Sequence, residues 1–205
     1  MSFKKLIPPL KEALTKFGFE DPTSFQKLVI PKIKGGANLI GIAPDGFGKT
    51  TTLIISTIQK LNGSAYQDVP RALIFVKDKD AAISLEEEFN KFIKNTDLRI
   101  FSAYEEGSIN FQKDSIYPGV DIVIATPKRL NKIYFQNGIN LTRLQLLIVE
   151  DSDFLVGTSF HTEIHRITES LTKCQYLVFG NKYDHKIEKL QELYLDHAQV
   201  IDIKS

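Results

Sequence analysis

One stretch of the sequence combines residue types that could bind a phosphate group, Ile42-Ala-Pro-Asp-Gly-Phe-Gly-Lys-Thr-Thr51. Gly46 and Gly48 allow the backbone to turn tightly and to direct its N–H groups toward a phosphate. Lys49 could reach the β- and γ-phosphates of a nucleotide, and the hydroxyl of Thr50 could ligate Mg²⁺. The stretch therefore predicts a phosphate-binding loop.

The segments on either side of this loop predict the elements that would position it. Residues 39–42 form an apolar run typical of a buried strand, and residues 50–61 form a hydroxyl-rich amphipathic run typical of a helix. The N-terminus of such a helix favours negative charge. Ala43 stands where the strict pattern has its first glycine, so an ordinary glycine-rich turn is the alternative. Strand, loop and helix in this order favour the phosphate loop.

Short apolar segments alternate with amphipathic segments along the rest of the chain, which predicts an α/β domain with a mainly parallel sheet and helices on both faces. We expect one domain over 1–205, with a helical region at 1–36 before a core at 37–205. The expected strands are 39–42, 73–76, 98–102, 121–125, 146–149, 175–179 and 200–203. The expected helices are one from Pro8 to before Gly18, then 24–33, 50–61, 81–94, 127–134, one within 159–171, and 184–194. Residues 105–117 show no clear period and predict a loop or a short irregular helix.

Charge and composition limit the function classes. A net charge of +1 gives no global attraction for nucleic acid, so any RNA-binding surface must be a local patch. The single cysteine, Cys174, cannot form an internal disulfide and fits a reducing compartment. No apolar run approaches the ~20 residues of a membrane span, and the first residues have no signal-peptide core. We therefore expect a cytoplasmic protein with no membrane partner.

A second group of polar residues, Glu150-Asp-Ser-Asp153, directly follows the apolar strand at 146–149. In a phosphate-loop protein, acids at the end of a neighbouring strand usually hold Mg²⁺ and orient water. A helix N-cap formed by Asp151, Ser152 or Asp153 explains the same residues equally well. Their position after the phosphate loop in the chain favours the first explanation, in which they hold Mg²⁺ and orient water.

From residue 3 to residue 203 the sequence resembles the DEAD-box RNA helicases, specifically their first RecA-like, phosphate-loop domain. The Q motif and motif I of that family resemble residues 19–26 and 43–50, and its motif Ib resembles residues 126–130. Glu150-Asp-Ser-Asp153 occupies the place of Asp-Glu-Ala-Asp, and Phe179-Gly-Asn-Lys182 occupies the place of Phe-Ser-Ala-Thr.

The resemblance implies that ATP and Mg²⁺ are the cofactors. It implies that Gln26 reads the adenine edge, that Phe19 stacks on the base and that Thr23 supports the loop. The implied catalytic residues are Lys49, Glu150 and Asp151, with Thr50 and Glu150 at the metal. The implied nucleotide-binding residues are Phe19, Thr23, Gln26, Asp45, Gly46, Phe47, Gly48, Lys49, Thr50 and Thr51.

The resemblance implies RNA contacts by Lys79, Thr126, Lys128 and Arg129, although a solvated charged face explains these residues equally well. Glu105 and Glu106 stand where the family has a Gly-Gly motif and would repel phosphate. We therefore expect RNA binding to be weak.

Three departures from the family pattern argue against full activity. Glu150 and Asp151 exchange the family's order of the two acids, which changes the reach of each carboxylate. Residues 180–182 lack both hydroxyls of the corresponding motif. The chain also ends where a first domain ends, which leaves either an excised domain or, as we favour, a natural one-domain relative.

These observations leave two main hypotheses open. The first is an ATP-binding, RNA-associated domain with weak or partner-dependent hydrolysis and no autonomous unwinding, which would need a second RecA-like domain or a protein partner in trans. The second is a catalytically dead nucleotide-binding or structural module that docks on a protein partner. A phosphate-loop kinase or GTPase is disfavoured, because no base-reading Lys/Asp motif replaces Gln26.

Overall fold

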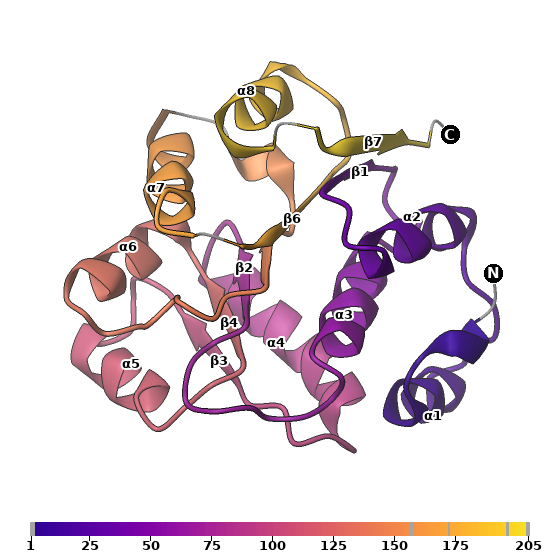
Figure 1. The fold of residues 1–205 in the computed structure, drawn as a ribbon, viewed down its shortest axis with the longest axis horizontal. Coiled ribbons are helices and arrows are strands. Elements are labelled where there is room, and N and C mark those ends of the chain that lie inside the picture. The colour runs from indigo at the N-terminus through magenta and orange to yellow at the C-terminus, as the bar shows by residue number, and fades with distance from the viewer. Residues whose placement is uncertain (1–2, 156–157, 172, 196, 204–205) are drawn as a thin grey trace.

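A parallel sheet forms the centre of the computed structural model, which describes residues 3–155, 158–171, 173–195 and 197–203 (Figure 1). Within these residues the sheet has seven strands in the order β3-β4-β2-β5-β6-β1-β7. The strands are β1 (Leu39–Ile42), β2 (Ala72–Phe75), β3 (Ile100–Ala103), β4 (Ile122–Ala125), β5 (Leu146–Val149), β6 (Gln175–Gly180) and β7 (Gln199–Asp202). Because β5, β6 and β1 are parallel neighbours, the segments that follow them meet at one edge of the sheet.

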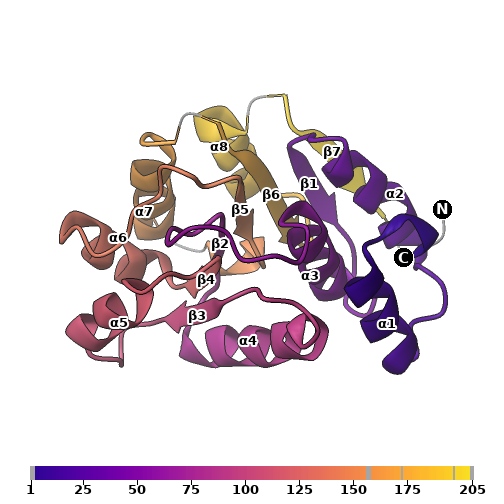
Figure 2. The same ribbon diagram turned by 60° about the horizontal axis from the view of Figure 1, so that its bottom comes forward.

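Helices cover both faces of this sheet, as Figure 2 shows most clearly. One face carries α1 (Pro8–Lys16), α2 (Ser24–Lys34), α3 (Lys49–Lys60) and α4 (Lys79–Ile93), and the other carries α5 (Ile109–Ile116), α6 (Pro127–Phe135), α7 (Thr158–Thr168) and α8 (His185–Tyr194). Successive strand residues point to opposite faces of the sheet. Leu39 therefore packs in the core beneath α1–α4, and Ile40 packs in the core beneath α5–α8. Both are fully buried. The expected α/β class with a parallel sheet is therefore confirmed.

Several element boundaries differ from expectation, and at two helices a capping residue explains the difference. Helix α4 begins at Lys79 rather than at 81, because the side chain of Asp78 accepts a hydrogen bond from the Ala81 N–H. The region without a clear period contains a regular helix, α5, which Ser108 caps through the Phe111 N–H. No helix in the described part of the chain is long and apolar enough to cross a membrane.

A buried ion cluster that the sequence did not predict joins the beginnings of three strands. Asp121 is fully buried before β4 and accepts from Arg71 Nη2 at 2.7 Å and from Arg99 Nε at 3.0 Å. Burial alone would raise the pKa of Asp121, but the hydrogen bonds from Arg99 and Arg71 outweigh it and hold this pKa below its usual value. Two further donors, the N–H groups of Tyr66 and Arg99, complete the shell of the carboxylate.

Candidate functional site

The predicted phosphate loop lies between β1 and α3, and two glycines give it its shape. Gly46 has φ 84° and Gly48 has φ 83°, a left-handed conformation that favours glycine. A Cβ atom on Gly48 would also come within 2.7 Å of Gln26 Nε2. Gly48 is the N-cap of α3, so the free N–H groups of this helix begin at the loop.

Lys49 extends back over its own loop. Its ammonium donates to the carbonyl oxygen of Ala43 at 2.6 Å, to that of Pro44 at 3.1 Å and to Asn181 Oδ1 at 2.5 Å. Asp45 Oδ1 lies 3.3 Å away but belongs to a side chain that is 92% exposed. Lys49 therefore lies at the loop with its donors bonded inside the protein, and Asn181 is a partner that sequence reasoning missed.

The segment before α2 is tied directly to this loop. Thr23 Oγ1 donates to the Phe47 carbonyl at 2.8 Å, and Gln26 Nε2 donates to the Gly48 carbonyl at 3.4 Å. Thr23 and Gln26 also form a reciprocal capping box at the start of α2. Thr23 is thus placed to support the loop, and the capping pattern alone could have revealed its partnership with Gln26.

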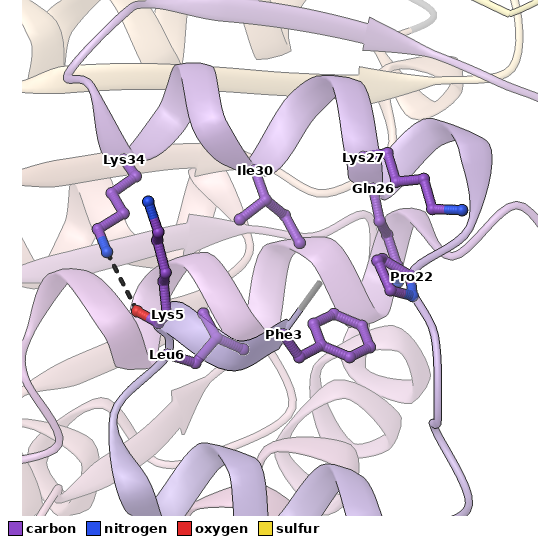
Figure 3. A pocket seen from close by; sticks show the side chains of 8 residues that line it. All are labelled: Phe3, Lys5, Leu6, Pro22, Gln26, Lys27, Ile30 and Lys34. Atoms are coloured by element: carbon purple, nitrogen blue, oxygen red, sulfur yellow. Dashed lines mark hydrogen bonds between the residues drawn. The ribbon is translucent and has the colours of Figure 1, made fainter. Parts of the chain in front are cut away.

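A pocket beside Gln26 lies between α2 and the short 3-10 helix Phe3–Lys5 (Figure 3). Lys34 Nζ donates to the Lys5 carbonyl at 3.1 Å and holds the two elements together. The pocket is lined by Phe3, Lys5, Leu6, Pro22, Gln26, Lys27, Ile30 and Lys34.

The structure places Phe19, the predicted base-stacking residue, apart from this lining. The Phe19 ring is 38% exposed and its centroid lies 6.1 Å from that of Phe92 on α4. Phe3 is the aromatic residue that faces the pocket beside Gln26. Sequence reasoning missed Phe3, because only the fold-back of the N-terminal segment onto α2 brings it there.

The acidic segment after β5 lies next to the phosphate loop. Burial first, and then the negative charge of Asp151, raise the pKa of Glu150 to about 7, although Lys77 and Lys49 act in the opposite direction. The side chain of Asp151 accepts from the Asp153 N–H at 3.0 Å and caps the 3-10 helix Ser152–Phe154. The cap explanation therefore holds for Asp151, while the role of Glu150, which lies near Lys49, at a metal ion stays a prediction.

The chemistry of these acids fits a Mg²⁺ ion carried by a nucleotide. In the described residues there is no group of three or more His, Cys, Asp or Glu side chains that could cage a metal. Mg²⁺ is commonly held by one or two carboxylates together with substrate phosphates. Glu150 and the hydroxyl of Thr50, at the start of α3, supply oxygen donors of that kind, and a cation would stabilise the ionised form of Glu150.

The segment after β6 fits closely against the acidic segment. Asn181 Nδ2 donates to Asp153 Oδ2 at 3.1 Å, so Asn181 joins Asp153 to Lys49. A Cβ atom on Gly180 would clash with Ser152 Oγ. The two positions therefore share one volume, and Ser152, which is 2% exposed, fills it.

The four predicted RNA-contact residues are not equally accessible. Thr126 and Arg129 are 2% and 6% exposed. Thr126 Oγ1 donates to Glu105 Oε2 at 2.5 Å, and Arg129 Nη2 donates to the carbonyl oxygens of Glu105 and Gly107. Both side chains are therefore buried against the Glu105 loop, which accepts from Thr126 Oγ1 and Arg129 Nη2, and their contact with nucleic acid stays a prediction.

The two lysines of this set remain more open. Lys79 Nζ lies 5.7 Å from the centroid of the Tyr104 ring, in a cation–π arrangement. Lys128 is exposed on α6. Glu163 of α7 lies near it, since Lys128 lowers the pKa of Glu163, which burial raises overall. Lys79 and Lys128 are therefore the more accessible cations among the four predicted residues.

Comparison with known proteins places this arrangement in a family. The model of the DEAD/DEAH box helicases matches residues 23–189. The human probable ATP-dependent RNA helicase DDX43 is 27% identical over 199 residues, which cover 95% of this chain and 31% of that protein. The Dictyostelium discoideum ATP-dependent RNA helicase ddx46 is 32% identical over 190 residues, or 89% of this chain and 16% of that protein.

Solved structures show the same fold. A DEAD box protein from Methanococcus jannaschii superposes with a TM-score of 0.89 at 25% identity, over 98% of this chain and 55% of that one. Yeast Dbp5 bound to Gle1 and IP6 gives a TM-score of 0.86 at 17% identity, over the whole chain and 52% of Dbp5. The chain thus spans less than half of the two sequence relatives and about half of each structural neighbour.

Proposed function

Because this chain belongs to the DEAD/DEAH box helicase family and has the fold of a RecA-like domain of that family, we propose that it binds ATP with Mg²⁺. The observation that carries the proposal is the pair of contacts from Thr23 to Phe47 and from Gln26 to Gly48. Through these contacts Gln26, which could recognise a base, lies next to the loop at residues 43–50, which could bind phosphates.

In this proposal the base and the phosphates are recognised by different parts of the site. The Gln26 amide uses one donor and one acceptor within the protein, which leaves a second N–H and a second lone pair for an adenine edge. Phe3 is placed to stack on the base. The N-terminus of α3 and the Lys49 ammonium attract the phosphates, while Thr50 and Glu150 would hold Mg²⁺.

We propose that hydrolysis is weak or depends on a partner. A carboxylate must position the attacking water, but Asp151 caps a 3-10 helix and Glu150 has a pKa of about 7, so it is ionised in only part of the molecules at neutral pH. The relatives named above are longer, and a second RecA-like domain, in the same or another chain, would supply cations to the transition state.

RNA binding is proposed to be weak. Thr126 and Arg129 are buried against the Glu105 loop, which leaves Lys128 and Lys79 for phosphate contacts. The burial of these two residues also favours the second candidate function, a nucleotide-binding module that docks on a protein. The yeast structural neighbour was solved with a protein partner, Gle1, which is consistent with that alternative.

A titration with ATP in the presence and in the absence of single-stranded RNA separates the two functions. ATP affinity that rises when RNA is added supports an RNA-associated ATP-binding domain, because coupling between the two sites must be reciprocal. ATP affinity that is indifferent to RNA supports the protein-docking module. Equal affinity for ATP and GTP contradicts the proposed base recognition by Gln26.

A further inference from the structure

The ammonium of Lys49 has three N–H donors, and all three have acceptors within the protein. Two of these acceptors, the carbonyl oxygens of Ala43 and Pro44, belong to the phosphate loop itself. The third close acceptor is Asn181 Oδ1 at 2.5 Å, which comes from the segment after β6, and Asp45 Oδ1 lies farther away at 3.3 Å on an exposed side chain. The Lys49 side chain is 14% exposed, so water replaces few of these contacts. A phosphate oxygen can bind Lys49 only by displacing one of them.

The orientation of the Asn181 amide is fixed from its other side. Its Nδ2 donates to Asp153 Oδ2 at 3.1 Å. An ionised carboxylate can only accept hydrogen bonds and an ammonium can only donate them. The amide therefore has one favourable orientation, with its NH₂ group toward Asp153 and its oxygen toward Lys49. Asp153 thus holds the oxygen of Asn181 against the ammonium.

We propose that Asn181 is a positioning residue of the phosphate site: its amide oxygen occupies the donor of Lys49 that a nucleotide phosphate needs, and so sets the affinity for nucleotides. This inference rests on the proposed binding of ATP at the same loop. Position 181 corresponds to the alanine of the Phe-Ser-Ala-Thr motif that residues 179–182 resemble. An alanine has no acceptor there, so the competition arises from the asparagine of this chain.

The loop carbonyls are not expected to have the same effect. They come from the segment that joins β1 to α3, only six and five positions before Lys49 in the chain. Asn181 follows directly after β6, the strand between β1 and β5 in the centre of the sheet, and it is bonded to Asp153 as well. Asn181 is therefore held from a second side as well, and its hydrogen bond, like those of the two carbonyl groups, is charge-assisted because the ammonium is the donor.

The test is a calorimetric titration of the whole chain with Mg·ATP and with AMP, which lacks the β- and γ-phosphates. Asn181→Ala is expected to bind ATP about tenfold more tightly than the unmodified chain, because it releases a charge-assisted hydrogen bond. AMP affinity is expected to stay the same. Asn95→Ala is the matched control, since it removes an exposed amide–carboxylate contact with Glu12 far from the site.

A second variant tests the route through Asp153. Asp153→Asn removes the carboxylate that holds the Asn181 amide against Lys49, so Asn181 Oδ1 should give way to a phosphate more easily. The change is expected to tighten ATP binding in the otherwise unmodified chain and to add nothing in the Asn181→Ala background. Additive effects of the two changes would contradict the inference. Unfolding curves for each variant establish that it is folded. If Asn181→Ala does not fold, the ATP affinity of Asp153→Asn is compared with that of the unmodified chain instead.

The outcomes separate this inference from the proposed function. Unchanged or weaker ATP binding by Asn181→Ala, while the unmodified chain binds ATP, overturns the inference and leaves the proposed function standing. A parallel gain for ATP and AMP also overturns it, because Lys49 would then not be the group released. If neither form binds ATP, both the function and the inference fail. Binding by the variant alone supports the inference in its strongest form.

Discussion

Ser152 occupies the space into which a side chain at position 180 would project. Gly180 ends β6 and Ser152 begins the 3-10 helix after β5, so the neighbouring strands bring the two residues together. A Cβ atom on Gly180 would clash with Ser152 Oγ, and Ser152 is buried. Of the two hydroxyls that residues 180–182 lack, the one at position 180 would thus overlap with Ser152 Oγ, so the side chain at one position limits the side chain at the other.

The first prediction follows from this shared volume. Gly180→Ser should destabilise the chain by about 1–3 kcal/mol, the usual cost of overpacking a core. Adding Ser152→Ala should recover most of the loss, because it clears the space. Urea unfolding of the two single variants and the double variant measures the coupling. Strictly additive losses would show that the two residues do not share the volume.

A second prediction concerns the buried ion cluster. Asp121→Asn should cost about 3–5 kcal/mol, because it leaves Arg71 and Arg99 without their carboxylate. The pKa of Asp121 is lowered from its ordinary 3.8, so its stabilising effect is present above that pH and is lost as the pH falls through the folded-state pKa. Unfolding curves measured from pH 6 downward should show acid sensitivity that the variant has largely lost.

A third prediction concerns Glu150, whose effect on the pH dependence of stability has the opposite sign to that of Asp121. Its pKa rises from 4.5 to about 7, so between these pH values the folded chain holds a proton that the unfolded chain has released. Stability should therefore fall as the pH rises from 4.5 to 7. Glu150→Gln should remove this slope, and unfolding midpoints measured across the window test it. A slope that is unchanged in the variant would place the titration on another group.

A fourth prediction separates buried from exposed cations on the face proposed for RNA. Arg129→Ala should destabilise the chain, because its guanidinium holds the Glu105 loop, yet it should leave RNA affinity unchanged. Lys128→Ala should leave stability unchanged and weaken RNA binding, with a smaller salt dependence. Fluorescence titrations with single-stranded RNA at several salt concentrations distinguish the two. Equal losses of affinity would mean that Arg129 reaches RNA after all.

The parts of the fold that local patterns control were predictable from the sequence. Strands β1 and β5 were predicted with their exact bounds, because each is a fully buried apolar run followed by a loop with distinctive chemistry. The region of helix α5 was predicted only as a loop or a short irregular helix, because its pattern is short and the Ser108 cap defines its start. The phosphate loop and the Thr23–Gln26 pair were recognisable because glycine conformation and capping are local properties.

The missed features of the site all depend on long-range contacts. Phe3 reaches the pocket only because the N-terminal segment folds back onto α2. Asn181 meets Lys49 across 132 positions of the chain, through the adjacency of β6 and β1. The burial of Arg129 follows from the path of the Glu105 loop. No periodicity in the sequence encodes these contacts, because each needs the order of strands in the sheet.

The central claim is that the loop at residues 43–50 and Gln26 together bind adenine nucleotides, and a titration with ATP and GTP in the presence of Mg²⁺ tests it most directly. The unmodified chain should prefer ATP, Gln26→Ala should narrow that preference, and Lys49→Ala should weaken the binding of both nucleotides. A wild-type chain that binds neither nucleotide, or that binds ATP equally well when Lys49 is replaced by alanine, would contradict the account.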